Sequence, residues 1–161
     1  MKNLIIIIIL SSMGLAQTNR SSVNVSVSAT IQDYLDMITL ADIDVGTVIP
    51  SDDRLVLNPQ TDQGAGIIMI RGRENASIQV GYSAQVEMIN QSTSSTLLVQ
   101  YSVFGNAENL QSSSTILELN PETVTLSGGG EYFLYIGCSF GLANLEQGQY
   151  DGDFVIEVDY N

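Results

Sequence analysis

The sequence predicts an all-β protein folded as a two-sheet β-sandwich. Apolar residues recur at every second position in about ten short segments, as half-buried strands require. Glycine, proline, asparagine and aspartate cluster between these segments, where turns need them. No window of helical length keeps a 3.6-residue period, so helices are not expected. Short strands separated by turn residues at this spacing are typical of a sandwich of antiparallel sheets.

Each expected strand has an apolar face. In the strands at 132–140 and 154–160 the even-numbered residues are mainly apolar. The run 67–70 is apolar throughout, which suits a strand that is covered on both faces. The three glycines at 128–130 predict a hairpin turn. The remaining strands are expected at 23–31, 43–45, 78–88, 97–103, 117–119 and 124–126, with exposed loops at 90–96 and 106–114.

The first 16 residues have the layout of a secretory signal peptide. A short leader with Lys2 precedes the apolar run 4–10, and small residues follow up to Ala16. The apolar run is far shorter than the ~20 residues that span a bilayer, so we expect a cleaved signal rather than a membrane anchor. The mature chain, without a membrane span, then divides into an N-terminal strand segment at 17–31 and a sandwich domain at 32–161.

Composition excludes several classes of function. The 161 residues include no histidine and a single cysteine, and the formal charge is −13. Serine–histidine and cysteine–histidine nucleophiles, imidazole metal sites and an internal disulfide are therefore impossible. Such an acidic chain repels nucleic acid. We predict no catalytic, cofactor-binding or metal-binding residues and do not expect an enzyme. Cys138 is expected as a small buried apolar residue, with an intermolecular disulfide as the alternative.

Carboxylates and tyrosines are the remaining chemical groups. Paired carboxylates can serve glycoside hydrolysis or bind calcium, but strand parity places these on polar faces, which favours a solvated surface. Tyrosines at alternating positions are expected mainly in the core, although a sugar-stacking surface is the alternative. The carboxylate pairs are Asp42/Asp44, Asp52/Asp53 and Asp151/Asp153, and the tyrosines are Tyr82, Tyr101, Tyr132 and Tyr135.

The two ends of the mature chain favour pairing with another strand. The segment 21–31 has no charge, proline or glycine, and every second residue from Val23 is apolar. Such a strand invites pairing if it lies at a sheet edge, so it must be paired in its own sandwich or in a neighbour's. The segment 149–160 has an apolar face, and its other face carries acidic residues that discourage sheet stacking but leave the backbone edge available.

Four stretches resemble known bacterial families. The stretch 148–161, with Gly148 fourteen residues from the end and a penultimate Tyr160, resembles the C-terminal signature of chaperone–usher pilins and spore-coat-U-like proteins. The whole mature chain resembles the bacterial domain-of-unknown-function family numbered 4402. That similarity is carried by 29–31, by 41–48, by 128–141 with Tyr135-Ile136-Gly137, and by the C-terminal Gly-x-Tyr-x-Gly-x-Phe run. The resemblance implies an immunoglobulin-like, pilin-like sandwich.

The resemblance implies export to the bacterial envelope but no known activity, and together with the two strand-like ends it supports a hypothesis of function. It predicts a secreted structural subunit of a fimbria on the bacterial surface, polymerised head-to-tail with itself by strand donation, with a periplasmic chaperone and an outer-membrane usher as candidate partners. The alternatives are that the first strand belongs to its own domain, and that the protein is a monomeric adhesion module, for example for glycans. The implied donor residues are Val23, Val25, Val27 and Ala29, and the implied groove residues are Gly148, Tyr150, Phe154, Ile156, Val158 and Tyr160.

Overall fold

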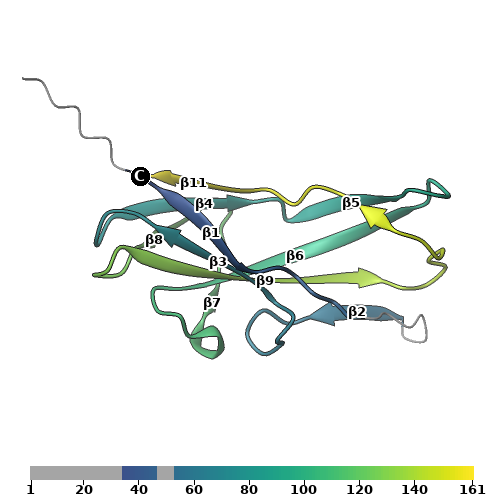
Figure 1. Cartoon of the computed structure of the whole chain (residues 1–161), viewed down its shortest axis with the longest axis horizontal. Helices are drawn as coiled ribbons and strands as arrows, with labels where there is room; N and C mark the ends of the chain where they lie inside the picture. Colours follow the sequence, from purple (N-terminus) through teal and green to yellow (C-terminus); the bar gives the residue numbers. More distant parts are fainter. Residues whose placement is uncertain (1–33, 47–52) are drawn as a thin grey trace, which may run out of the picture. The chain divides into compact units, whose positions relative to one another are not determined.

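The computed structural model describes residues 34–46 and 53–161, and these residues form two antiparallel sheets (Figure 1). They contain no α-helix, only one short 3-10 turn at Gln111–Ser113. This confirms the prediction of an all-β, two-sheet fold. The strands are β1 (Asp36–Ala41), β2 (Arg54–Leu57), β3 (Gly66–Arg71), β4 (Ser77–Tyr82), β5 (Gln85–Asn90), β6 (Thr96–Asn106), β7 (Thr115–Ile116), β8 (Glu122–Thr125), β9 (Glu131–Gly141), β10 (Tyr150–Asp151) and β11 (Ile156–Tyr160).

The two sheets differ in size. The larger sheet has the strand order β1-β3-β9-β6-β5-β10, with β2 beside the second half of β9 and β7 beside the second half of β6. The smaller sheet has the order β11-β4-β8. Every pair of strands in the described residues is antiparallel. Strand β9 lies at the centre of the larger sheet, between β3 and β2 on one side and β6 on the other.

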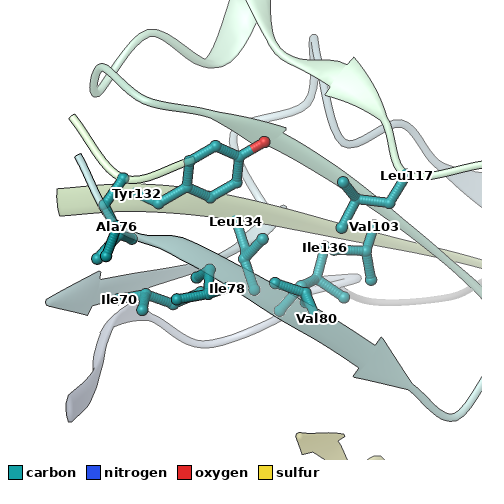
Figure 2. Packing of buried hydrophobic residues seen from close by; sticks show 10 residues of the cluster. Ile70, Ala76, Ile78, Val80, Val103, Leu117, Tyr132, Leu134 and Ile136 are labelled. Atoms are coloured by element: carbon teal, nitrogen blue, oxygen red, sulfur yellow. The ribbon is translucent and has the colours of Figure 1, made fainter. Parts of the chain in front are cut away.

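The sheets meet over a first apolar cluster, which we call the closed cluster. In Figure 2, Ile78 and Val80 from β4 lie against Leu134 and Ile136 from β9. Ile78, Val80 and Leu134 are completely buried. The predicted alternation of β4 and β9 produces this contact, because every second side chain of a strand points to the same face. The closed cluster comprises Ile70, Ala76, Ile78, Val80, Val103, Leu117, Leu126, Tyr132, Leu134 and Ile136.

The outer face of β9 is also covered at this end. Phe133 and Tyr135 are buried, and the Tyr135 hydroxyl donates a hydrogen bond of 2.9 Å to Asn109 Oδ1. The Gln111 side-chain amide donates to the backbone oxygens of Pro59 and Asp62, at 2.9 Å each. The loop 106–114 is largely exposed, as its polar composition predicts, but it also bonds to Tyr135 and to the loop before β3. Its amide side chains satisfy backbone groups of the neighbouring loop, which composition does not reveal.

Two strand connections also differ from the prediction. Strands β4 and β5 were expected as one bulged strand, but the chain changes sheets at residues 83–84. The C-terminal segment changes sheets at the same place, since β10 pairs with β5 and β11 pairs with β4. Between these pairs, Ser83 N donates a hydrogen bond of 2.9 Å to Val155 O. The prediction of a hairpin at 128–130 is wrong, because β8 and β9 belong to different sheets although a tight turn joins them. Sequence periodicity does not show which sheet a strand enters.

Candidate functional site

The C-terminal strand is the edge of the smaller sheet and carries a row of apolar side chains. Tyr150, Phe154, Ile156, Val158 and Tyr160 face the core but remain only half-buried, as the predicted parity requires. The acidic residues between them are exposed. Strand β11 pairs with β4 along one edge, and no strand of the described residues pairs with its other edge. A row of half-buried apolar side chains therefore lies beside a backbone edge that no described strand occupies.

Strand β1 is the edge of the larger sheet, and we call the region between the edges of β1 and β11 the groove. Strand β1 pairs only with β3 among the described residues. Met37 lies opposite Ile70, so it faces the core side of the sheet, yet 45% of it is exposed. Ile43 and Val45 continue this side and are half-buried. Among residues 34–46 and 53–161, no strand therefore pairs with β1 or β11 on the side that borders the groove.

The C-terminal tyrosine joins the two sides at one end of the groove, where Figure 1 shows β1 close to the end of β11. The Tyr160 hydroxyl donates a hydrogen bond of 2.9 Å to Tyr34 O and accepts one of 2.8 Å from Arg73 N. The Arg73 guanidinium lies 5.5 Å from the centre of the Tyr160 ring. Gly72 leaves room for this arrangement, because a Cβ there would lie 2.5 Å from the Tyr160 hydroxyl.

The other end of the groove opens into an apolar cavity of about 560 Å³. Its floor is formed by Leu97, Val99 and Cys138, which belong with Leu57 to a second buried cluster, the open cluster. No residue of the smaller sheet belongs to this cluster. Among the described residues, the smaller sheet therefore covers the inner face of the larger sheet at the closed cluster but not at this end. The cavity is lined by Ile43, Val45, Met88, Leu97, Val99, Tyr101, Cys138, Phe140 and residues 145–148 and 150.

Phe154 and Gly148 set the path of the C-terminal segment past the cavity. The Phe154 ring stacks on Tyr101 with a centroid distance of 4.2 Å. Gly148 has φ +153°, which disfavours other residues, and a Cβ there would collide with the Asn90 side chain. Asn90 is 1% exposed, and its Oδ1 accepts hydrogen bonds from Ser92 N and Thr93 N. Asn90 was expected in an exposed loop, and its role is not visible in the sequence pattern.

No group on the floor of the cavity is charged at neutral pH. Burial raises the pKa of the Cys138 thiol and of the Tyr101 hydroxyl, so both stay neutral. Cys138 is a free, buried cysteine, which confirms the expectation of a small apolar residue in the core. A neutral, apolar floor suits an apolar side chain better than a polar ligand.

The other candidate groups do not converge on a site. Tyr132 and Tyr135 are buried and Tyr82 and Tyr101 half-buried, so these four form no exposed platform for a sugar. The described members of the carboxylate pairs, Asp42, Asp44, Asp53, Asp151 and Asp153, are exposed. Within 34–46 and 53–161, no three potential metal ligands gather in one place.

Several predicted residues lie outside the described residues. These are the donor residues Val23, Val25, Val27 and Ala29, together with Asp52. No helix in the described part of the chain is long and apolar enough to cross a membrane. Sequence reasoning predicted the apolar face of the C-terminal strand but missed the cavity, whose floor comes from β6 and β9. Strands that are distant in sequence form it, so no local motif could have identified it.

Comparisons with known proteins assign no family to this chain. No model of a known protein family matches the sequence. A comparison with curated proteins finds no match either.

Proposed function

We propose that this protein is a structural subunit of a pilin-like filament on the bacterial surface. In the filament, the segment 21–31 of one subunit enters the groove of the next. The observation that carries the proposal is an apolar cavity beside two sheet edges, β1 and β11, that no other strand of the described residues pairs with along the groove. The segment 21–31 is the complementary element, because it is uncharged and apolar at every second position.

An added strand can use both features of the groove. Its backbone pairs with the edge of β11 that borders the groove, and its alternate side chains point to the core side. Val23, Val25, Val27 and Ala29 then lie in one row above the half-buried residues of the C-terminal strand and the cavity. Each valine that becomes fully buried contributes about 1.5–3 kcal/mol. The acidic residues on the outer side of β11 stay in water, so the insertion buries none of these charges.

Donation between subunits makes an open polymer. The donor segment and the groove are different surfaces, so the contact is head-to-tail and leaves a free groove and a free donor at the ends. A subunit without a donor exposes its apolar groove, which is hazardous during export. This supports a role for a periplasmic chaperone that covers the groove until an outer-membrane usher delivers the next subunit.

Substitutions on the two faces of the donor segment test the proposal. Val25→Asp places a charge in the apolar row, and Ser26→Asp places the same charge in the polar row one residue away. Wild-type mature chain and Ser26→Asp should form polymers that electron microscopy and size-exclusion chromatography detect, whereas Val25→Asp and deletion of 17–29 should not. Polymers of unchanged length from Val25→Asp would contradict the proposal. A wild-type monomer at all concentrations would instead favour the monomeric adhesion module.

A further inference from the structure

The outer face of the larger sheet is uncovered at the end where β2, β5, β6 and β9 run side by side. Three large apolar residues there are strongly exposed: Val56 by 64%, Leu98 by 53% and Ile89 by 51%. The register places Val56, Leu98 and Ile89 on the face opposite the groove. Solvent-exposed apolar side chains that share one sheet face are a feature of protein contact surfaces.

Four residues form a row across this face. Arg54 of β2 lies opposite Gly141 of β9, and Glu87 of β5 lies opposite Leu98 of β6. The β6–β9 register, continued by two residues from Gln100 and Ser139, places Leu98 beside Gly141. The order across the sheet is therefore Arg54, Gly141, Leu98, Glu87. All four residues are exposed.

The row contains a hollow beside a protruding side chain. A depression of about 240 Å³ is lined by Arg54, Leu98 and Gly141, among others. Gly141 leaves it open, because a Cβ at this position would meet only Asp53 O, at 3.9 Å. Leu98 stands next to the hollow. A protruding leucine and a hollow of sufficient size thus lie one strand apart.

Charges of opposite sign stand at the two ends of the row. The Arg54 guanidinium donates hydrogen bonds to Ser139 Oγ at 2.7 Å and to Gln100 Oε1 at 3.4 Å, which hold it against the sheet. Within 34–46 and 53–161, neither Arg54 nor Glu87 forms an ion pair, whereas Arg71 pairs with Glu131 at 3.3 Å. An immobilised cation and a distant carboxylate thus face solvent from the same surface.

We propose that this face binds the same face of a second copy of the chain. A two-fold axis along the strands, between β9 and β6, reverses the order of the row. Arg54 then faces the partner's Glu87, and Leu98 faces the hollow over the partner's Gly141. The row spans about 14 Å, three strand spacings, and two sheets in face-to-face contact lie about 10 Å apart. Each contact occurs twice, as a closed two-fold interface requires.

The contact is independent of strand donation, because it uses the outer face of the larger sheet and the groove lies on the inner face. If subunits polymerise by donation, the contact joins neighbouring filaments side by side. If they do not, it forms a simple dimer. The row itself points to a second copy as the partner. When its order is reversed, each charge meets the opposite charge and the leucine meets the hollow.

Charge reversal in the full mature chain tests the pairing, with Val25→Asp present throughout to remove polymers formed by donation. Sedimentation equilibrium should show a dimer. Arg54→Glu and Glu87→Arg should each raise its Kd at least about tenfold, because two attractive pairs become repulsive, and the double variant should restore it. A double variant as weak as the singles, or a parent chain that stays monomeric up to about 1 mM, would overturn the pairing.

A second variant tests the hollow without altering charge. Gly141→Leu fills the depression, and the open space at this position means that the fold should tolerate it. We expect the Kd for dimerisation to rise at least about tenfold, with an unchanged thermal midpoint at low protein concentration. An unchanged Kd would overturn the proposed docking of Leu98. If the wild-type chain forms no polymer, the same charge reversals are measured in the wild-type chain without Val25→Asp, so the two proposals fail separately.

Discussion

The two ends of the sandwich share strands β6 and β9 but differ in what covers them. At the closed cluster the smaller sheet lies over Leu134, which is completely buried. At the open cluster no strand of the smaller sheet covers Phe140, six residues further along β9, and Phe140 is only half-buried. Strand β9 thus contributes to a fully buried core at one end and to a partly exposed apolar cluster at the other. The second half of β9 therefore carries more apolar surface than the described residues bury.

The largest difference should appear when each end is truncated. Leu134→Ala should lower the free energy of unfolding by about 2–5 kcal/mol, because it opens a cavity in a close-packed core. Phe140→Ala should lower it by about 1 kcal/mol in the isolated subunit, because its ring is already half in solvent. Urea unfolding followed by circular dichroism measures both values. Equal losses would mean that the two ends are equally packed.

Alkaline pH should act on the closed end. Burial and the nearby Glu122 raise the pKa of Tyr132 from 10.0 to about 12. The unfolded chain then releases this proton at a lower pH than the folded chain does. Stability should be unaffected below pH 10 and fall by about 2 kcal/mol as the pH rises to 12. Tyr132→Phe should remove this part of the loss, and the same loss in that variant would assign it to other groups.

Thiol reactivity reports on the open end. Cys138 lines the cavity, and burial raises its pKa, so a thiol reagent should react slowly and only at a pH above that of a free cysteine. A donor strand in the groove should slow the reaction at least about tenfold further, which corresponds to about 1.4 kcal/mol. The comparison is between assembled wild-type protein and Val25→Asp subunits, with urea-unfolded chain as the reference for full reactivity. Equal rates would show that the cavity is not covered on assembly.

Much of the fold could be predicted from the pattern of single strands. The alternation in 132–140 and 154–160 identified which residues face the core, because strand geometry alone sets that parity. The assignment of strands to sheets could not be predicted. The switch at residues 83–84 and the separate sheets of β8 and β9 depend on pairing between distant segments, and local sequence carries no record of that pairing.

The candidate site divides in the same way. The sequence predicted the apolar row from Tyr150 to Tyr160, which the structure shows half-buried, whereas the predicted strand at 21–31 lies outside the described residues. The sequence did not reveal the cavity over Cys138, the buried Asn90 beneath Gly148, or the row that ends in Arg54 and Glu87.

The sequence by itself determined that this chain forms strands and which side of each strand is apolar, because these properties follow from a repeat of two residues. Only the tertiary structure decided which apolar sides meet and which stay uncovered. That decision depends on the sheet in which each strand pairs, and pairing brings together backbone groups that are many residues apart. The sheet edges, the cavity and the outer row exist only once those pairs have formed.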